Sequence, residues 1–539
     1  MALSPVTRTP ASDGPDKPGQ DERDGATCSE LALTPRTFPA TVYRVNRPFN
    51  QFRHYSRMTF AAAPSDANRG LYLTGLTQLR GGSNAEATNT FRRLLARDPT
   101  HAGARRNLIR ALAAGGQHDS VIAETLREAP ANAELLFLRG TAFNALGRPA
   151  DAREALTASI ALDPTFAPAW LNLGNALLDA DELTEAEAHC RHALALDPQL
   201  IEAQVSLGFV LTVQGRIKEA IAVLEAAIRA APENVQAHWN LAAATLLDGD
   251  LPRGFAEYEW RKRHDRFRRD FIDLPGPVWD GGDPRGRTIL VHSEQGLGDT
   301  VQFARYLAMI VERGGHPVLA CEPSLIPLLA AIEGVRAVPK TGALPPYDAW
   351  IDQMSLPHVF GTTLTTIPFP AGYLRADPGL IHSHRATLPP IRCAGLAWAG
   401  NPLHQNDRRR TPPEHVFRPL AARDDWHLIS LMPERALPGI AGPERPLTDY
   451  AETAALIAAL DLVITVDTSV AHVAGALGRP AWVLLPYAPD WRWLRLRSDT
   501  PWYSSVRLFR QPSPGDWNAV IESVAAALAR FESNPVGPH

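Results

Sequence analysis

The sequence predicts an α-helical solenoid followed by two parallel α/β domains that face a cleft. Two observations lead to this fold class. Pro130, Pro164, Pro198 and Pro232 recur at a spacing of 34 residues, which is typical of helical repeats. From Arg287 onward, short β-branched runs alternate with amphipathic segments, which is the pattern of parallel sheets covered by helices.

Composition indicates a soluble globular protein. The chain has 539 residues, of which 45% are hydrophobic and 21% charged, enough for three or four domains of about 150 residues. Its net charge of −4 gives no electrostatic reason to expect a nucleic-acid partner. The four cysteines form no Cys-x-x-Cys pair, which suits a reducing cytosol. We therefore expect a cytoplasmic protein, with peripheral contact to the inner membrane left open.

Changes in composition divide the chain into segments. We expect residues 1–66 to be disordered, because they lack an apolar core. The longest uncharged run, 353–374, contains three prolines and cannot form a transmembrane helix. The remaining predicted segments are the solenoid (67–270), a linker (271–286), the first α/β domain (287–380), a second linker (381–392) and the second α/β domain (393–535). The predicted strands are Thr288–His292, Pro317–Cys321, Tyr347–Ile351, Cys393–Trp398, His427–Leu431, Leu462–Val466 and Ala481–Leu485.

The solenoid repeats carry a specific pattern, as in "PAWLNLGNALLDADELTEAEAHCRHALALDP". Small residues let two helices approach, and proline ends the second helix. These segments resemble tetratricopeptide repeats. The signature positions are Trp170, Leu173, Gly174, Ala186, Ala193 and Pro198, and again Leu207, Gly208, Gly215, Ala220, Ala227 and Pro232. We place repeat starts near Asn68, Ala102, Ala133, Ala167, Ile201 and Val235.

The concave face of such an array is a surface for extended peptides. Asn172 and Asn240 occupy the same repeat position. This half resembles the O-linked N-acetylglucosamine transferases, in which asparagines at that position grip the substrate backbone, and the resemblance implies acceptor binding. The alternative is two solvated polar residues, because Leu138 and Ser206 interrupt the ladder.

Two charged features of the repeats have ordinary structural interpretations. The Asp-x-Asp sequences 179–181 and 248–250 are predicted turns rather than metal sites, because aspartate favours turn geometry. The block "RKRHDRFRR", 261–269, is predicted to be a solvated helix end. Docking onto the next domain is the alternative.

The stretch "LVITVDTSVAHVAGALGRP" predicts a buried strand, a turn at Asp467 and a helix. Free N–H groups at residues 469–471 and the helix dipole favour a bound anion. Thr468 and His472 share one face of that helix. A capped core helix with a buried histidine is the alternative.

Residue by residue, "DTSVAHVAGALGRP" resembles the diphosphate motif of glycosyltransferase family 9, the heptosyltransferases, and the similarity extends over roughly 287–530. It implies a GT-B fold, with two Rossmann-like domains, and inverting sugar transfer without a cofactor or metal. Asp467, Thr468, Ser469 and His472 then hold the diphosphate of a nucleotide-sugar donor. The combination with repeats resembles a bacterial repeat-glycosyltransferase family.

A second motif is "LVHSEQGLGDTVQFARYL", 290–307, in which Gly296 and Gly298 permit a sharp turn and close approach to a ligand. The resemblance places Asp299 as the general base. A helix N-cap is the alternative for this aspartate. Val301 stands where a dinucleotide fingerprint needs glycine.

A third motif supplies cations. A helix dipole stabilises an anion by only about 0.3–2 kcal/mol, so a diphosphate needs further positive charge. Arg408, Arg409 and Arg410 offer guanidinium groups, which suit phosphate. The family uses a lysine in this loop, so we leave open which arginine contacts the diphosphate. An exposed charge run is the alternative.

Three further residues complete the predicted cleft. Glu434 follows a strand near the position where the family binds ribose with an acid. Asp490 and Trp491 lie in "PYAPDWRWL", and both are candidates for sugar or acceptor contact. Packing between domains is the alternative for Trp491.

We therefore expect a glycosyltransferase that uses a nucleotide sugar, with the repeats recruiting a protein or peptide acceptor. A glycolipid or polysaccharide acceptor and self-association through the repeats are alternatives. Two other classes are a repeat scaffold with an inactive transferase domain and an NAD-dependent or sugar-modifying Rossmann enzyme.

Overall fold

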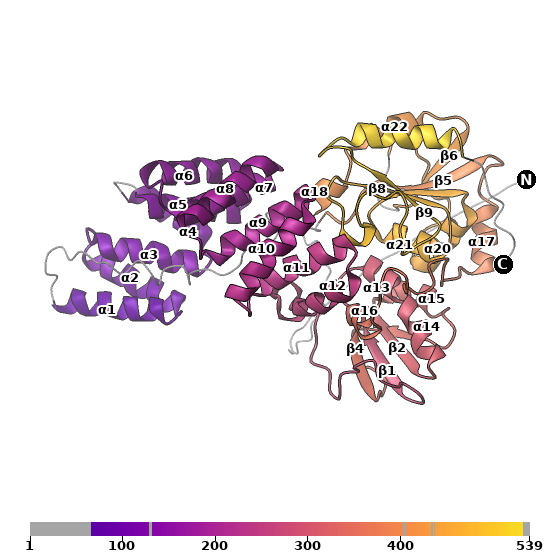
Figure 1. Ribbon diagram of the computed structural model, residues 1–539, viewed down its shortest axis with the longest axis horizontal. Helices are drawn as coiled ribbons and strands as arrows, with labels where there is room; N and C mark the ends of the chain where they lie inside the picture. The colour runs from indigo at the N-terminus through magenta and orange to yellow at the C-terminus, as the bar shows by residue number, and fades with distance from the viewer. Residues whose placement is uncertain (1–65, 129–131, 403–405, 433–434, 436, 532–539) are drawn as a thin grey trace, which may run out of the picture. The chain divides into compact units, whose positions relative to one another are not determined.

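The computed structural model describes residues 66–128, 132–402, 406–432, 435 and 437–531 (Figure 1). These residues all fall within one compact unit. Residues 1–65 of the segment expected to be disordered, and Glu434, lie outside the described residues. Within the described ranges, no helix combines the length and apolar character that crossing a membrane requires.

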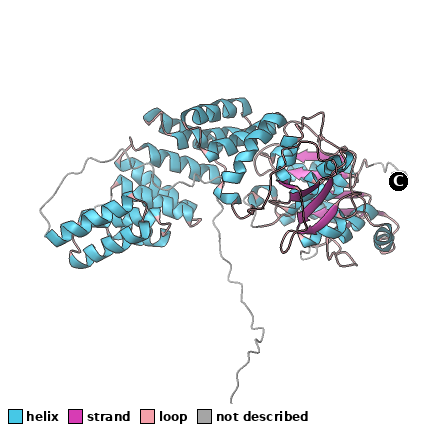
Figure 2. Ribbon diagram, turned by 90° about the horizontal axis from the view of Figure 1, so that it is seen from below, coloured by secondary structure: helices cyan, strands magenta, loops and turns pink. Residues whose placement is uncertain are grey.

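The first half is helical, and Figure 2 shows strands only in the second half. In its described part, twelve helices pack as six consecutive pairs. Repeat starts match the prediction at Ala102, Ala133, Ala167, Ile201 and Val235, and the first helix begins at Asp66. The helices are α1 (Asp66–Arg80), α2 (Asn84–Arg97), α3 (Ala102–Ala114), α4 (His118–Arg127), α5 (Ala133–Ala145), α6 (Pro149–Leu162), α7 (Ala167–Asp179), α8 (Leu183–Leu196), α9 (Ile201–Gln214), α10 (Ile217–Ala230), α11 (Val235–Asp248) and α12 (Leu251–Tyr258).

The small residues of the repeats do pack as the pattern indicates. A Cβ atom on Gly174 would lie 3.1 Å from Cys190 Sγ, and one on Gly208 would lie 2.5 Å from Leu224 Cγ. Both glycines, each on the first helix of its repeat, therefore receive a side chain of the second helix. This interlocking makes each pair a unit with its own buried seam.

The first sheet is parallel, with the strand order β3-β2-β1-β4 among the described strands. Its centre is β1, where Leu290 pairs with Val318 on one side and with Trp350 on the other. The elements are β1 (Thr288–His292), α13 (Leu297–Phe303), α14 (Arg305–Glu312), β2 (His316–Cys321), α15 (Ile326–Leu329), β3 (Arg336–Pro339), β4 (Ala349–Asp352) and α16 (Leu356–Val359).

The second sheet is also parallel, with the order β6-β5-β7-β8-β9 in the described chain. Every residue of β7 is buried, as expected for a central strand with helices on both faces. The elements are α17 (Pro378–Arg385), β5 (Arg392–Ala397), α18 (Asp407–Arg410), α19 (Arg418–Ala421), β6 (Trp426–Ser430), α20 (Tyr450–Ala459), β7 (Leu462–Val466), α21 (Ser469–Ala476), β8 (Ala481–Leu485), β9 (Val506–Arg510) and α22 (Trp517–Leu528).

Both predicted linkers contain ordered structure. In the first linker, Trp279 is 2% exposed and its backbone N–H donates to the Trp350 carbonyl at 2.7 Å. Residues next to β4 therefore extend the first sheet domain. The second linker begins inside α17, where His384 contacts Glu452 of α20 at 2.7 Å.

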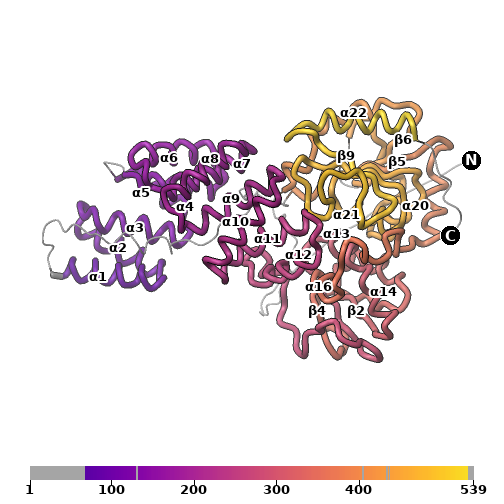
Figure 3. The backbone as a smooth tube through the Cα atoms, viewed as in Figure 1, coloured from indigo at the N-terminus to yellow at the C-terminus, as the bar shows by residue number. Residues whose placement is uncertain are grey.

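The last repeat shares one hydrophobic core with both sheets. The backbone trace shows its helix α12 beside α16 of the first sheet domain (Figure 3). Phe255 and Tyr258 of α12 pack edge-on against Trp491, and Phe255 also contacts Phe303 of α13. The repeat array and the α/β domains are thus joined by packed aromatic side chains.

The basic block corrects one expectation, because its Arg261 is not solvated. This arginine is fully buried and forms a bidentate ion pair with Glu294, which follows β1, at 3.0 and 2.6 Å. The backbone N–H of Met354 also donates to Glu294, at 3.0 Å. Arg261 therefore docks onto the next domain, which was the alternative interpretation of the basic block.

Candidate functional site

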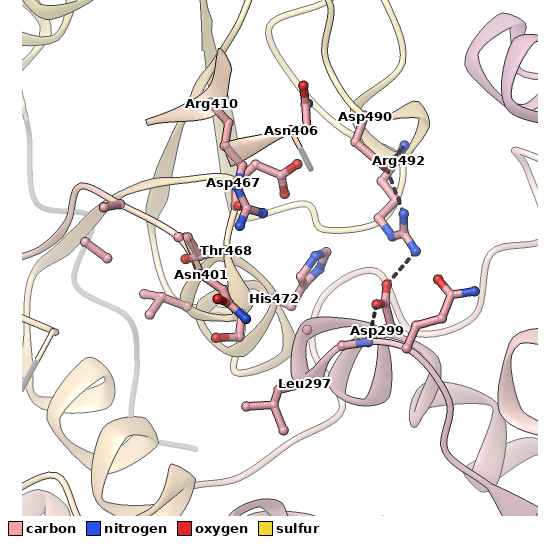
Figure 4. A pocket seen from close by; sticks show the side chains of 18 of the residues that line it. Leu297, Asp299, Asn401, Asn406, Arg410, Asp467, Thr468, His472, Asp490 and Arg492 are labelled. Atoms are coloured by element: carbon pink, nitrogen blue, oxygen red, sulfur yellow. Dashed lines mark hydrogen bonds and ion pairs between the residues drawn. The ribbon is translucent and has the colours of Figure 1, made fainter. Parts of the chain in front are cut away.

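One cavity of about 1120 Å³ lies where the carboxyl ends of strands from both sheets meet (Figure 4). Residues after β1, β2, β5, β6, β7 and β8 line it. Ligands of parallel α/β sheets bind at these carboxyl ends. Predicted site residues on its wall are Gly296, Gly298, Asp299, Arg409, Arg410, Asp467, Thr468, Ser469, His472, Asp490 and Trp491.

The predicted strand, turn and helix are β7, the turn at Asp467 and α21, which together form one side of the cavity. Strand β7 ends at Val466 and α21 begins at Ser469, with Thr468 as an extended N-cap residue. The Thr468 hydroxyl lies 3.1 Å from that of Thr465, and the Ser469 hydroxyl lies 2.7 Å from Tyr450 Oη. Both hydroxyls are therefore fixed at the amino end of a helix whose dipole favours an anion.

His472 lies one turn into α21 and is 4% exposed. Its Nδ1 lies 3.0 Å from Tyr503 Oη, and its ring stacks on Trp493. Burial, with the nearby Arg492 charge, lowers the pKa of His472 to about 3. The imidazole is thus neutral at pH 7 and offers a hydrogen bond rather than a positive charge.

Asp299 stands at the start of α13. Its Oδ2 accepts the Gly296 N–H at 2.9 Å, so the aspartate helps to cap the helix from its third position, while the N-cap residue itself is Gly296. Its Oδ1 accepts from Arg492 Nη2 at 2.5 Å. Gly298 beside it allows α13 to reach α21, because a Cβ there would lie 2.8 Å from His472 Cδ2.

Arg492 links the two domains across the cavity, and the sequence analysis missed it. It is 7% exposed and also donates to Asp490 Oδ1 and Gln302 Oε1, both at 2.8 Å. Burial lowers the pKa of Arg492, but the Asp490 and Asp299 carboxylates outweigh this effect and raise it above the ordinary arginine value. The signal available in the sequence was its place between two tryptophans, two residues after Asp490.

The three arginines of α18 take different directions. Arg410 faces the cavity, and its guanidinium donates to the Asp467 carbonyl at 2.9 Å and to Asp407 at 3.1 Å. Arg409 lines the cavity but pairs with Asp181 of the repeats at 2.6 Å. Arg408 is outside the cavity lining and donates to the Asp179 carbonyl. The geometry therefore favours Arg410 for an anion in the cavity.

Burial and neighbouring charges act on two of the predicted site carboxylates of the second α/β domain. Asp467 is half-buried near Asp490, and desolvation followed by that neighbouring charge raises the pKa of Asp467. Asp490 itself is paired with Arg492. Trp491 is 7% exposed and packs against the last repeat, which is the alternative considered for it.

The two asparagines of the predicted ladder are outside the cavity lining. Asn172 is half-buried and donates to Thr141 Oγ1 at 2.9 Å. Asn240 is 2% exposed and donates to the Val205 carbonyl at 3.3 Å. Both join neighbouring repeats, so Asn240 in particular is not presented to an acceptor.

Other residues of the repeats do reach the cavity. Phe209 and Val213 of α9, with Trp239 and Leu247 of α11, form an apolar wall. Phe267 extends this wall. The wall was not predicted, because nothing in a repeat sequence tells which repeat faces the catalytic half.

Metal ligands are not grouped in the described part of the chain, where no cluster of three histidine, cysteine, aspartate or glutamate side chains occurs. Independence from metal stays a prediction, and so does the absence of a cofactor.

Comparison with known proteins agrees with the division of the chain into helical repeats and an α/β region. The chain matches a tetratricopeptide repeat family over residues 72–136, 120–165, 137–201 and 211–259. It matches glycosyltransferase family 9 (heptosyltransferase) over residues 445–492, a segment that contains α21 and Arg492. The chain thus carries tetratricopeptide repeats followed by an α/β region with a family 9 segment. These matches support a glycosyltransferase with a repeat region.

A curated relative has 29% identity over 322 residues, namely protein FlbA of Caulobacter vibrioides (strain ATCC 19089 / CIP 103742 / CB 15). The match covers 53% of this chain and 54% of FlbA, so this chain spans about half the length of that relative. Among solved structures, a thermophilic repeat protein of Thermus thermophilus is 23% identical, with a TM-score of 0.30, over 33% of this chain and 99% of that one. MamA (41 to end) from Desulfovibrio magneticus RS-1 is 21% identical, with a TM-score of 0.29, over 31% and 97%.

Proposed function

We propose that this chain transfers a sugar from a nucleotide diphosphate sugar to a hydroxyl group of a protein acceptor, with inversion and without a metal ion. One observation supports this most directly. The carboxyl ends of both sheets, the amino end of α21 and Arg410 line a single cavity. Two facing parallel sheets of this kind correspond to a GT-B arrangement.

The donor diphosphate binds at α21. The backbone N–H groups of Ser469 and Val470 and the helix dipole face the anion, Arg410 supplies a full positive charge, and His472 supplies a neutral hydrogen bond. Fixed donors of this kind stabilise the charge that develops on a leaving diphosphate. The same groups remove the need for a divalent cation.

The acceptor hydroxyl binds on the opposite side, beside Asp299. The Asp299 carboxylate takes the proton of the hydroxyl while the hydroxyl oxygen attacks the anomeric carbon, and the nucleoside diphosphate leaves from the other face. Arg492 orients the carboxylate, since it holds Oδ1 at 2.5 Å. A single displacement of this type inverts the anomeric configuration.

The acceptor class follows from the repeats. Tetratricopeptide repeats suggest protein–protein interaction, and the wall of Phe209, Val213, Trp239 and Leu247 is apolar. An apolar wall of this kind suits the side chains of a polypeptide better than a free sugar. The proposed acceptor is therefore a protein segment held along the repeats.

The decisive experiment measures nucleoside diphosphate release from UDP-, GDP- and ADP-sugars in excess chelator, with calorimetric titration of the free nucleotides. One base is expected to bind and one donor to be consumed. Arg410→Ala should weaken nucleotide binding by about 1.5–3 kcal/mol, the value of a hydrogen bond to a charged group. Arg418→Ala, at an exposed arginine of α19, is the matched control and should bind as wild type.

The alternatives give different outcomes in the same titration. A repeat scaffold with an inactive domain binds none of the nucleotides. A dinucleotide enzyme binds NAD instead. Either result would refute the proposal.

A further inference from the structure

The turn between the two helices of each repeat has one backbone position in the left-handed region. It is the residue before the N-cap of the second helix. Five of the six repeats in the described chain use glycine there, and the fourth repeat uses Asp181, with φ of 62°. The glycines are Gly82, Gly116, Gly147, Gly215 and Gly249, with φ between 69° and 92°.

Asp181 therefore stands where the fold favours glycine. A side chain with positive φ costs conformational free energy, although aspartate tolerates this region better than most residues. The repeats provide their own comparison, since the same turn is built without this cost in five other places. A strained residue of this kind indicates a role outside its own turn.

That role is a contact with the α/β half. Asp181 Oδ1 accepts from Arg409 Nε at 2.6 Å, and Arg408 lies 3.6 Å from Oδ2. The same two arginines donate to the last carbonyls of α7, Arg409 to Leu178 at 2.9 Å and Arg408 to Asp179. The carboxylate and the negative end of the helix dipole thus bind both guanidinium groups.

The turns of the next two repeats also contact the α/β half. A Cβ on Gly215 would lie 1.4 Å from Arg495 Nη1, and one on Gly249 would lie 3.0 Å from Leu364 Cδ1. At Gly82 and Gly116 a Cβ would meet nothing within 4 Å. The turns of repeats four to six therefore contact the α/β half, and those of repeats one and two do not.

The arginines held by Asp181 directly precede Arg410 on α18. This helix has four residues and contributes no buried side chain of its own, so outside contacts must fix its orientation. Arg408 and Arg409 bind the repeats while Arg410 lies against Gly400 and the Asp467 carbonyl, facing the cavity.

We propose that Asp181 is a positioning residue of the donor site, which fixes α18 through Arg408 and Arg409 so that Arg410 meets the donor diphosphate. The inference rests on the proposed function. It makes the fourth repeat part of the nucleotide site, although Asp181 itself is outside the cavity lining.

The test is Asp181→Gly, which restores the residue of the other repeats. Removing the strain and removing the ion pair have opposite effects on stability, so the variant should unfold at nearly the wild-type temperature. Its affinity for the nucleoside diphosphate that wild type binds, among UDP, GDP and ADP, should fall about three- to tenfold. Amides of residues 407–411 should exchange hydrogen faster.

Two further variants separate positioning from general stability. Gly116→Asp creates the same strain at a turn where a Cβ would meet nothing within 4 Å, and should lower the unfolding temperature without changing nucleotide affinity. Arg409→Gln should weaken binding as much as Asp181→Gly, and the double variant should be no weaker than either. Arg409→Lys should recover part of the loss, because it keeps the charge.

The outcomes distinguish this inference from the proposed function. Wild type that binds none of the three nucleotides refutes the function, and hydrogen exchange at 407–411 then decides whether Asp181 fixes α18. Unchanged exchange in Asp181→Gly overturns the inference. So does wild-type nucleotide affinity in that variant.

Discussion

At the scale of single residues, Asp299 shows that helix capping and the proposed role of general base are compatible, although the sequence presented them as alternatives. It caps α13 through Gly296 and lies in the cavity, where Arg492 holds its other oxygen. A carboxylate bound in this way has one fixed orientation, which a general base requires. Its capping therefore does not argue against catalysis.

Asp299→Asn should lower the transfer rate by about 100-fold or more and leave donor affinity nearly unchanged. Asparagine still accepts the Gly296 hydrogen bond, so the helix remains capped, but it cannot take a proton from the acceptor. The measurement is transfer rate against calorimetric nucleotide affinity. Asp490→Asn is the control, because it removes the other carboxylate of Arg492. Equal loss of rate in both variants would mean that Asp299 only positions Arg492.

His472 should make stability depend on pH. Its pKa is about 3 in the folded chain against 6.5 when unfolded. Between these values the unfolded chain binds a proton that the folded chain does not, so stability falls as pH decreases from about 6.5 toward 3.

Between pH 7 and pH 5, the free energy of unfolding should decrease in wild type by about 2 kcal/mol more than it does in His472→Gln. Chemical denaturation at the two pH values measures it. The exposed His358 serves as the control, and His358→Gln should behave as wild type. An identical pH dependence in His472→Gln would contradict the neutral, buried imidazole.

At the scale of elements, the sequence was sufficient to predict segments whose structure is determined by the repeat period or by a strongly apolar run. It predicted β1, β7 and β8 to the residue. It missed β3 (Arg336–Pro339), whose residues are exposed or half-buried, and β9 (Val506–Arg510), in which two of the five residues are arginines. It also could not assign Arg408 and Arg409, because their partners in the fourth repeat lie 228–231 residues away in the chain.

The helix pairs give a stability prediction. Gly208→Ala should destabilise the protein by about 1–3 kcal/mol, because the new Cβ would lie 2.5 Å from Leu224 Cγ. Gly70→Ala in α1, where a Cβ meets nothing within 4 Å, should instead stabilise by about 0.5–1 kcal/mol. Thermal unfolding of the two variants tests this. If both substitutions changed the unfolding temperature in the same direction, packing between paired helices would not explain the effect of Gly208→Ala.

At the scale of the whole molecule, the repeats do not form one uniform accessory. Repeats five and six line the cavity and the sixth shares its core with both sheets. The fourth contacts α18. Within the described chain, the turns of the first two show no such contact, so we expect these repeats to be available to the proposed acceptor.

Removing residues 1–162 should therefore separate the two functions. The shortened chain keeps Asp181 and the cavity, so it should bind nucleotide as the full chain does. Transfer to the native protein acceptor should fall, because tethering on the repeats raises the acceptor to an effective concentration in about the millimolar range. Titration and acceptor labelling measure the two effects. An undiminished labelling rate would count against protein recruitment by these repeats.

The contacts of the repeat turns also determine where the array can lengthen during evolution. Duplicating a whole unit ahead of Ala133 would leave Asp181 opposite Arg409 and Gly215 opposite Arg495. Duplicating a unit between repeats four and five would move Asp181 one unit away from α18. Changes in repeat number should accumulate at the amino-terminal end alone, so descendants of this protein can acquire new acceptors while their sugar chemistry stays the same.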